Sequence, residues 1–525
     1  MKRVGLISLV FLVLGFNIVS GEGLRILAYF RGENYGDKLG YKVASAGDVN
    51  SDGYADVFVG ASGADKVYLY YGGSPMDTTA DLVFNRIIYG LWNVGDINGD
   101  GYRDVVMGDS IDERVQLFYG GTALDTISEF VFVGENVSQY GENYGNWVSG
   151  GADVNGDDKN DLLIAADNYR GTDDSYKGKV YLYHGGSLLD TTADWTATYV
   201  RILGHQDAWS AAIIGDVNSD GFADIGVGSI GSSIDFPGKV YIYFGGSPMD
   251  TLPDLIINSP GDRWAHFGAY IAPLSDINQD GYDDFVVAGV YPCVYFGGEV
   301  LDSLPGIICQ YQGDVACNAG DVNHDGYDDL LAGDEGYGYE SGAVFFYFGS
   351  SDMDSICDLA IYGGLTDFHF GKSVAGLGDV DGDGVDDFIV GARYMYDPWD
   401  RGEAWIFAGD STLPSDVEEE EGQVLAKFSI LEQNYPNPFN SSTTIPFTVH
   451  GKQKTENGPI PTTLKIYNIR GQLVKTLVDE ELNPGEYKVS WDGENTQGKE
   501  VASGVYFYRL KTGEFVQTQK MVLIR

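Results

Sequence analysis

The 525-residue chain has few basic residues and few histidines. Its 32 lysines and arginines are outnumbered by 78 aspartates and glutamates, which gives a net charge of −46 at pH 7. A chain of this charge repels phosphate backbones, so it is not a nucleic-acid binder that works by neutralising phosphates. The six histidines show neither metal-ligand spacing nor a neighbouring nucleophile motif. We therefore expect no enzyme, although so many carboxylates leave a glycosidase-type acid pair open as an alternative.

Long apolar runs are confined to the N-terminus. Lys2 and Arg3 precede an apolar run from Val4 to about Phe16, and small residues follow. This order is typical of a secretory signal peptide, which we assign to residues 1–21. The run is short for a membrane anchor and no stop-transfer charges follow it, so we expect no transmembrane segment in the mature chain.

Cysteine is scarce as well. The four cysteines lie close together in the sequence, at Cys293, Cys309, Cys317 and Cys357. An exported chain folds in an oxidising compartment, where four cysteines allow three pairings. We expect one or two local disulfides, with buried thiols as the alternative.

Glycine and aromatic residues, by contrast, are plentiful. The 73 glycines are roughly twice the usual share of ~7% and follow no three-residue period, which indicates many tight turns rather than collagen. The aromatic content of 13% is sufficient for a large core. Many turns together with many tyrosines and valines predict an all-β protein.

One acidic pattern recurs seven times. It reads Asp-x-[Asp/Asn]-x-Asp-(Gly)-x-x-Asp, and its copies begin at Asp48, Asp96, Asp153, Asp216, Asp276, Asp321 and Asp379. A short apolar run follows each copy, and most repeats continue with an alternating run, a Gly-Gly turn and a second alternating run, which predict a β-hairpin. Each repeat of 45 to 63 residues thus holds about four strands. Seven four-stranded repeats predict a seven-bladed β-propeller, here over residues 22–412.

The ends of the repeat array predict how the ring closes. The last repeat ends at residues 402–410 without an outer strand. Residues 23–30 resemble the outer strands of the other repeats and precede the first acidic loop. We predict that this N-terminal strand completes the seventh blade.

The acidic loops are predicted calcium sites. Oxygen ligands at alternate positions, with a glycine that lets the chain turn, suit a hard cation that takes six to eight oxygens. We expect up to seven structural Ca²⁺ ions, because empty carboxylate clusters repel one another. The predicted side-chain ligands are Asp48, Asn50, Asp52, Asp56, Asp96, Asn98, Asp100, Asp104, Asp153, Asn155, Asp157, Asp161, Asp216, Asn218, Asp220, Asp224, Asp276, Asn278, Asp280, Asp284, Asp321, Asn323, Asp325, Asp329, Asp379, Asp381, Asp383 and Asp387.

Two other interpretations of these loops fit the sequence less well. An EF-hand needs a glutamate at loop position 12, where apolar residues such as Val59 and Met107 stand. Ordinary turn formation does not account for seven copies in register. The third loop departs most from the pattern, because Asp158 replaces the glycine.

The seventh repeat carries a family resemblance. Its run FGKSVAGLGDVDGDGVDDFIVGA, residues 370–392, resembles the FG-GAP repeat of the integrin α-subunit propeller. The resemblance extends over all seven repeats and implies a seven-bladed propeller with calcium in hairpin loops. Several copies depart from it at their ends, as at Leu39-Gly40 and Gly108-Asp109, and these departures weaken any transfer of integrin ligand specificity.

The C-terminal residues have a different composition. An acidic linker over residues 413–427 precedes about seven short alternating segments in residues 428–525, which predict a small Ig-like β-sandwich. The stretches NYPNPFN (434–440), LKIYNIRGQLV (464–474) and SGVYFYRL (503–510) resemble the type A C-terminal sorting domain of the bacterial type IX secretion system. The resemblance implies a diderm bacterium, export through the periplasm, the type IX secretion machinery as partner, and secretion or display at the cell surface. A fibronectin-like accessory domain is the alternative.

Aromatic residues that precede the acidic loops are candidate ligand contacts. Gathered at one face of the propeller, their rings would stack on sugars or anchor protein ligands, whereas the alternative is packing between blades. We select Trp92, Trp147, Trp209 and Trp264. The sequence thus predicts an exported, calcium-stabilised binding or adhesion module for glycan or extracellular protein ligands. A polysaccharide-active lyase or hydrolase, or a passive surface protein, is the alternative.

Overall fold

A computed structural model describes most of the chain. The described residues are 17–18, 24–86, 90–109, 111–122, 124–135, 141–169, 177–187, 189–200, 205–231, 238–260, 266–363, 369–393, 401–413, 430–431, 434, 436–449, 459–483, 485–512 and 515–524. The chain divides into two compact units, Met1–Asp416 and Val417–Arg525. Within the described residues, no helix is long and apolar enough to cross a membrane.

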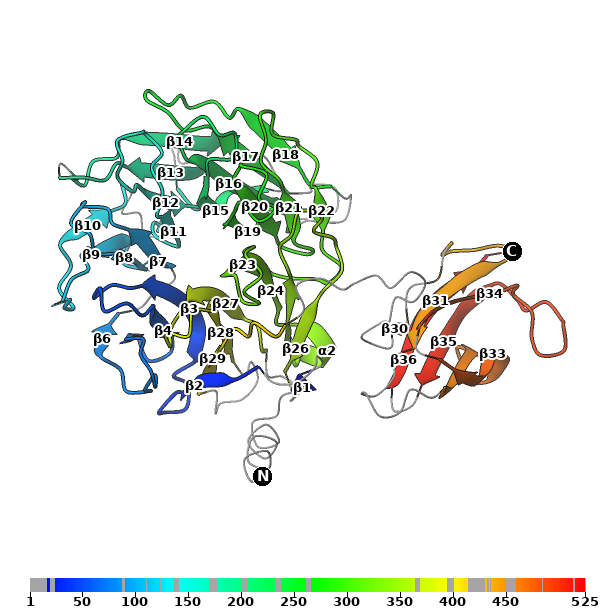
Figure 1. The fold of residues 1–525 in the computed structure, drawn as a ribbon. Coiled ribbons are helices and arrows are strands. Elements are labelled where there is room, and N and C mark those ends of the chain that lie inside the picture. The colour runs from blue at the N-terminus through cyan, green and yellow to red at the C-terminus, as the bar shows by residue number, and fades with distance from the viewer. Residues whose placement is uncertain are drawn as a thin grey trace. The chain divides into compact units, whose positions relative to one another are not determined.

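The first unit contains seven antiparallel sheets that surround a central axis (Figure 1). Six of these sheets use four consecutive strands each, which makes every repeat one blade. In chain order the blades are β3 (Leu39–Gly47), β4 (Asp56–Ala61), β5 (Lys66–Tyr70) and β6 (Leu82–Asn85); β7 (Gly90–Gly95), β8 (Asp104–Asp109), β9 (Arg114–Phe118) and β10 (Phe130–Val133); β11 (Trp147–Gly150), β12 (Leu162–Ala166), β13 (Lys177–Tyr183) and β14 (Trp195–Val200); β15 (His205–Gly215), β16 (Asp224–Gly231), β17 (Lys239–Tyr243) and β18 (Leu255–Asn258); β19 (Tyr270–Ser275), β20 (Asp284–Ala288), β21 (Cys293–Tyr295) and β22 (Ile307–Ile308); and β23 (Val315–Gly320), β24 (Asp329–Asp334), β25 (Ala343–Tyr347) and β26 (Leu359–Tyr362). The prediction of an all-β propeller with seven blades is confirmed.

Two short elements belong to the sixth blade. Strand β1 (Asn17–Ile18) pairs antiparallel with β26 and makes this sheet five-stranded. The short helix α2 (Tyr337–Glu340) lies between β24 and β25. Neither element interrupts the order of the four blade strands.

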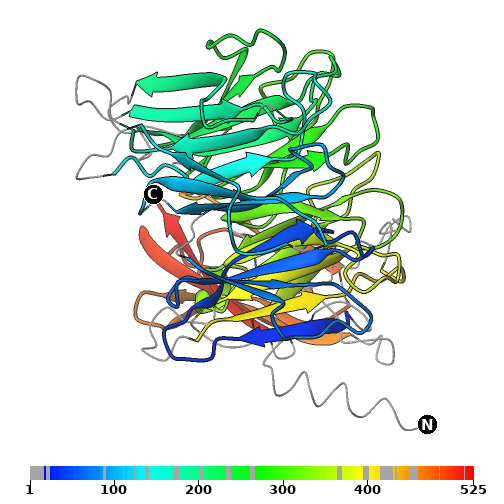
Figure 2. The ribbon, with the colours of Figure 1, turned by 90° about the vertical axis from the view of Figure 1, so that its left-hand side faces the viewer.

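The seventh blade joins the two ends of the repeat array. Its three inner strands are β27 (Ser373–Gly378), β28 (Asp387–Ala392) and β29 (Glu403–Phe407), and the outermost strand is β2 (Ile26–Arg31). Strand β2 pairs antiparallel with β29, and Figure 2 shows it in blue beside the yellow strands of this blade. The predicted N-terminal completion of the seventh blade is confirmed.

The sequence of each strand matches its place in the blade. The second strands, such as β4 and β28, are buried along their whole length, which explains their continuous apolar sequences. The outer strands β6, β10 and β18 alternate between exposed and more buried residues, as expected for strands with one solvated face. The innermost strands of neighbouring blades contact one another around the ring, and β27 closes it onto β3.

The core lies between blades rather than in one central cluster. The first and seventh blades, for example, share a cluster that contains Val43 and Val57 on one side and Ile389 and Ile406 on the other. Because each blade buries its faces only against its neighbours, stability depends on an unbroken ring.

The four cysteines do not form the expected disulfides. All four lie in the described residues as thiols, and no disulfide joins them. Cys293, Cys309 and Cys357 are buried, and Cys317 is half-buried. The expectation of a disulfide is therefore wrong for this structure, and buried thiols, the alternative, describe three of the four residues.

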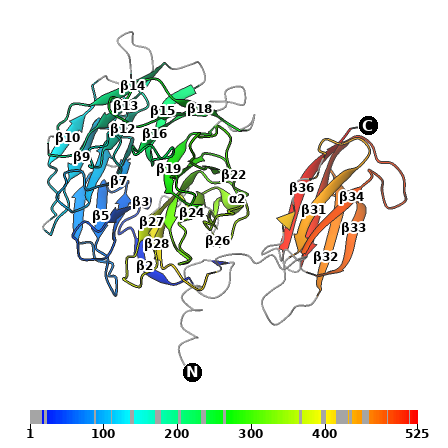
Figure 3. The same ribbon diagram turned by 45° about the horizontal axis from the view of Figure 1, so that its top comes forward.

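The second unit is a two-sheet sandwich (Figure 3). One sheet has the order β30-β31-β34 and the other β33-β32-β35-β36. The strands are β30 (Ile430–Leu431), β31 (Thr443–Val449), β32 (Ile460–Asn468), β33 (Leu473–Leu482), β34 (Gly485–Trp491), β35 (Gly504–Thr512) and β36 (Phe515–Leu523). Trp491 and Tyr508 are fully buried in its core. This confirms the predicted small sandwich.

The closure of the ring provides a first prediction. Phe30 on β2 is 3% exposed and its ring centroid lies 4.3 Å from that of Tyr70 in the first blade. We expect Phe30→Ala to lower the free energy of unfolding by about 3–5 kcal/mol in chemical denaturation, because it empties a buried site between two blades. Ile127→Ala, at a residue that is 73% exposed, is the control and changes stability by about 0.5 kcal/mol or less. Equal effects of the two substitutions would contradict the closure role of β2.

Candidate functional site

The seven acidic loops share one backbone conformation. The fourth and sixth loop positions have positive φ, as at Ser51 (57°) and Gly53 (92°) in the first loop. Glycine adopts this region without steric cost, which explains the glycine at the sixth position of six loops. In the third loop Asp158 takes the same region with φ of 61°, which aspartate tolerates better than most residues. The third loop therefore keeps the common geometry despite its departure in sequence.

Hydrogen bonds within each loop orient the first and fifth aspartates. In the first loop, Asp48 accepts the N–H of Asp52 at 3.1 Å and that of Gly53 at 2.9 Å. Asp52 in turn accepts the N–H of Tyr54 at 3.0 Å. Asn50 donates its side-chain amide to Asp52 at 3.0 Å. Each carboxylate oxygen has two acceptor sites, so one hydrogen bond leaves an oxygen able to bind an ion as well.

The ninth-position aspartate has a second task that the sequence analysis did not assign. These seven side chains are 0% exposed, and each accepts one N–H from its own loop and one from the turn after the third strand. In the first blade, Asp56 accepts the N–H of Val49 at 2.9 Å and that of Gly72 at 2.9 Å. The corresponding aspartates are Asp104, Asp161, Asp224, Asp284, Asp329 and Asp387. The carboxylate thus fastens the acidic loop to the outer hairpin of the same blade.

A glycine is required where the hairpin reaches this carboxylate. A Cβ at Gly72 would lie 2.4 Å from the backbone oxygen of Ala55, closer than any side chain tolerates. This close approach explains why the first residue of the Gly-Gly turns is glycine. The glycine is therefore the feature of the sequence from which the link between the turn and the acidic loop could have been predicted.

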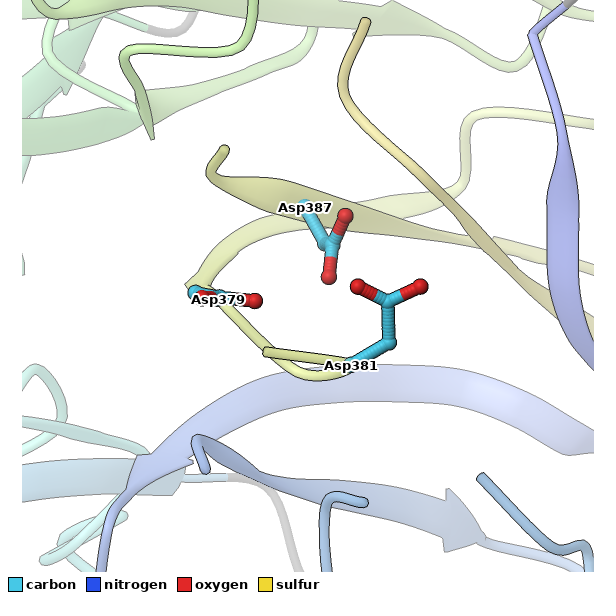
Figure 4. Close-up of side chains that lie close together, drawn as sticks. All are labelled: Asp379, Asp381 and Asp387. Atoms are coloured by element: carbon cyan, nitrogen blue, oxygen red, sulfur yellow. The ribbon is translucent and has the colours of Figure 1, made fainter. Parts of the chain in front are cut away.

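The donor set of the seventh loop is the most acidic. Asp379, Asp381 and Asp387 each place a carboxylate oxygen within 4.8 Å of the others, and Figure 4 shows the three groups pointing toward one another. Among the described residues this is the one group of at least three acidic, histidine or cysteine side chains that converges in this way. The other six loops have asparagine at the third position, so their donor sets combine amide and carboxylate oxygens.

The seventh loop is also linked to the closing segment. Arg25, which precedes β2, places Nη2 2.6 Å from Asp381 and 3.1 Å from Asp383. Its guanidinium offsets part of the extra negative charge that Asp381 brings in place of asparagine. Ring closure and this loop therefore stabilise each other.

The loop residues fit a calcium ion by their donor chemistry. The predicted ligand side chains of every loop are aspartates and asparagines, whose carboxylate and amide oxygens are ligands that Ca²⁺ prefers. In the third loop, Asn155 Oδ1 is buried and accepts no hydrogen bond from the described residues. A buried acceptor without a donor is costly, and a cation would satisfy it.

Burial raises the pKa of the ninth-position carboxyls. Desolvation is the largest cause, and the backbone N–H bonds oppose it only in part. The pKa rises to about 6 for Asp161, to about 7 for Asp56, Asp104, Asp224, Asp284 and Asp387, and to about 8 for Asp329. Without a cation, these groups therefore bind protons near neutral pH.

The tryptophans that were predicted to contact a ligand do not gather at one site. Trp147 contacts residues of blades that are not its neighbours. Its ring centroid lies 4.9 Å from that of Tyr270, and Lys42 Nζ lies 5.5 Å from the centroid of the Trp147 ring. Trp92 lines an axial cavity. Trp209 is half-buried on β15 and is not among the residues that line this cavity, and Trp264 falls outside the described residues.

Most of the aromatic residues that directly precede a glycine pack in the core, which was the alternative to ligand contact. Tyr144, Phe267 and Phe370 are at most 2% exposed. Phe370, for example, contacts Trp405 with ring centroids 5.7 Å apart. Tyr35 differs, because it is 54% exposed.

Comparison with known proteins identifies the repeats. Residues 48–107 match the FG-GAP-like repeat and residues 144–183 match the FG-GAP repeat. The first unit is a β-propeller that contains FG-GAP repeats. Residues 442–514 match the FlgD Ig-like domain, in agreement with the sandwich of the second unit.

Curated relatives match a limited part of the chain. Integrin alpha-7 of Rattus norvegicus is 31% identical over 144 residues, which are 26% of this chain and 12% of the relative. Integrin alpha-5 of Xenopus laevis is 32% identical over 184 residues, 34% of this chain and 14% of the relative. Human phosphatidylinositol-glycan-specific phospholipase D is 32% identical over 158 residues, 28% of this chain and 18% of the relative. The chain thus spans less than a fifth of the length of these relatives.

One solved structure resembles the chain weakly. It is a structure of PorZ, described as an essential bacterial surface component of the type IX secretion system of Porphyromonas gingivalis. The match covers 93% of this chain and 60% of the other, with 14% sequence identity and a TM-score of 0.32. A similarity at this level does not establish a common fold for the full chains.

The two tasks of the loop aspartates can be separated in the fourth blade. Asp220→Asn keeps an acceptor for the N–H of Phe222 but removes a charge from the predicted ion site. Asp224→Ala leaves the N–H groups of Val217 and Gly245 without their acceptor. Thermal and denaturant unfolding, each with calcium and with chelator, measures both effects.

We expect chelator to lower the melting temperature of the unmodified chain. Asp220→Asn should lose stability with calcium and match the unmodified chain in chelator. Asp224→Ala should lose about 2 kcal/mol or more under both conditions, because two buried donors are left unsatisfied. A melt that does not respond to chelator would contradict the calcium assignment.

The raised pKa values predict the pH dependence of the chelated protein. A carboxyl with a higher pKa in the folded chain than in the unfolded chain binds its proton more tightly when folded, so stability falls as pH rises from about 4 through the folded pKa. We therefore expect the melting temperature in chelator to be higher at pH 5.5 than at pH 8.

Two matched variants separate the effect of the buried carboxyls from the general charge repulsion in a chain whose net charge is −46. Asp329→Asn, which cannot titrate, should reduce the change in melting temperature between the two pH values. Asp352→Asn, at an exposed position, should leave it as in the unmodified chain. Identical pH profiles for all three proteins would refute the assignment.

Proposed function

We propose that this chain is an exported, calcium-stabilised binding or adhesion module that acts outside the cell or at the cell surface on glycan or protein ligands. The observation that carries the proposal is the closed FG-GAP propeller with seven acidic loops of one geometry and an axial cavity lined in part by Trp92 and Lys42. The integrin α relatives share the repeat.

The second unit supplies the proposed route out of the cell. We infer that residues 428–525 are a type A sorting domain that the type IX secretion machinery recognises after export to the periplasm through the signal peptide 1–21. Support comes from the motifs between residues 434 and 510 and from the seven-stranded sandwich that contains them. The match to an Ig-like domain agrees with this fold and does not distinguish a sorting domain from an accessory one.

Binding can be tested with the full mature chain on an array of glycans and matrix proteins. We expect retention on a defined ligand class in calcium and loss of retention in chelator, because the loops hold the binding surface in shape. Trp92→Ala should weaken retention, whereas Ile127→Ala on the outer surface should leave it unchanged.

Turnover would favour the alternative of a polysaccharide-active enzyme. New chain ends released from a polysaccharide, without stable retention, would contradict the binding proposal. The phospholipase D relative carries an enzyme name, but the match covers only 18% of that protein.

A further inference from the structure

The axial channel contains a cavity that the acidic loops do not account for. Its volume is about 230 Å³, and it is enclosed by the innermost strands β3, β7, β19, β23 and β27. Its lining includes the polar side chains of Lys42, Ser45, Asn93 and Asn318, together with the rings of Trp92 and Tyr270. This volume is just below the range of about 300–1,000 Å³ that drug-sized ligands occupy, so a ligand of this cavity is small.

Lys42 is the charged group of the cavity. No carboxylate among the described residues lies within ion-pair distance of its Nζ, although aspartate and glutamate outnumber lysine and arginine more than twofold in the chain. Lys372, the neighbouring lysine, is instead paired with Glu335 at 2.7 Å. Burial, and to a smaller extent the charge of Lys372, lowers the pKa of Lys42 to about 8, which leaves the ammonium protonated at neutral pH.

Aromatic rings hold Lys42 in place. Its Nζ lies 5.5 Å from the centroid of the Trp147 ring, which packs edge to face against Tyr270. The three residues come from the first, third and fifth blades, so they meet across the axis. A cation–π contact stabilises an ammonium without neutralising its charge, and the charge stays available to an anion.

The other polar side chains that line the cavity limit the kind of ligand that fits it. Asn93 Oδ1 accepts the N–H of Gly95 at 2.8 Å, which leaves the Nδ2 of the amide as a donor. Asn318 is engaged with Asp328 and with the backbone, and so it shapes the wall rather than binding a ligand. Ser45 Oγ donates to the carbonyl of Leu377 at 3.1 Å and accepts the N–H of Gly47 at 3.0 Å, so Ser45 also belongs to the wall. A cation, one amide donor and flat aromatic surfaces together suit a sugar ring that carries a carboxylate.

We propose that the axial cavity binds a hexuronate, with the carboxylate paired to Lys42, a ring hydroxyl bonded to Asn93, and an apolar sugar face against Trp92. This inference rests on the proposed binding function and names a ligand class for one of its sites. The acid arrives either as a free monosaccharide or as the end residue of a glycan, since both present the same carboxylate and ring.

Calorimetric titration of the full mature chain in calcium buffer tests the proposal. Sodium D-glucuronate is the probe and D-glucose is its neutral counterpart. We expect saturable binding of one glucuronate per chain and at least tenfold weaker binding of glucose. Absence of glucuronate binding at concentrations up to about 10 mM would overturn the proposal.

Variants at two lysines connect the binding to the cavity. Lys42→Met keeps the aliphatic stem and removes the charge, and we expect it to weaken glucuronate binding by about tenfold to a hundredfold. Lys66→Met is the control, because Lys66 Nζ lies 5.9 Å from the Tyr68 ring centroid on an outer part of the first blade. Lys42→Arg keeps the charge and should retain binding, which keeps the test valid if the methionine variant fails to fold. Equal binding by Lys42→Met and the unmodified chain would overturn the assignment of Lys42.

Further outcomes separate this inference from the general binding proposal. If Lys42→Met is still retained on the array, the general binding proposal holds, but the axial cavity is not the site that contacts the array ligand. Glucuronate binding without array retention would support the axial site and contradict adhesion. A disaccharide that ends in glucuronate distinguishes the two sources, because tighter binding than the monosaccharide supports a glycan end and weaker binding supports the free acid.

Discussion

A buried carboxylate in each blade is the interaction on which this structure depends. The ninth aspartate of every acidic loop accepts one N–H from its loop and one from the outer hairpin, as Asp56 does from Val49 and Gly72. The innermost and outermost parts of a four-stranded blade are therefore joined through one side chain. Because blades pack mainly on their neighbours, and β2 closes the ring on β29, a fault in one blade weakens the whole propeller.

This constraint explains the acidity of the chain and its relation to calcium. Many aspartates are used to hold backbone turns, for example Asp81 with the N–H of Tyr71 and Asp254 with that of Phe244. The loops bring further carboxylates together, and the burial that raises the pKa of Asp329 to about 8 is unfavourable to its charge. A divalent cation offsets this repulsion, so the proposed ions and the buried aspartates act on the same structural element.

The sequence predicted the blades better than the channel. Repeat spacing and alternation were sufficient for seven blades, the clasp by residues 23–30 and the sandwich, because these depend on local patterns. The contact of Trp147 with Tyr270 and Lys42 joins blades that are not neighbours, and a repeat pattern contains no information on which side chains reach across the axis. The second task of Asp56 was missed for a related reason, since its partner Gly72 lies sixteen residues away in a turn.

The central claim, that the acidic loops are occupied calcium sites, is tested most directly by counting the ions. Atomic emission spectroscopy on the full chain, dialysed against buffer with a low concentration of calcium, gives the number of ions per molecule. The account predicts several ions per chain, up to seven, and fewer by one when the ligands of a single loop are replaced. A chain that retains no calcium while its ring stays folded would contradict it.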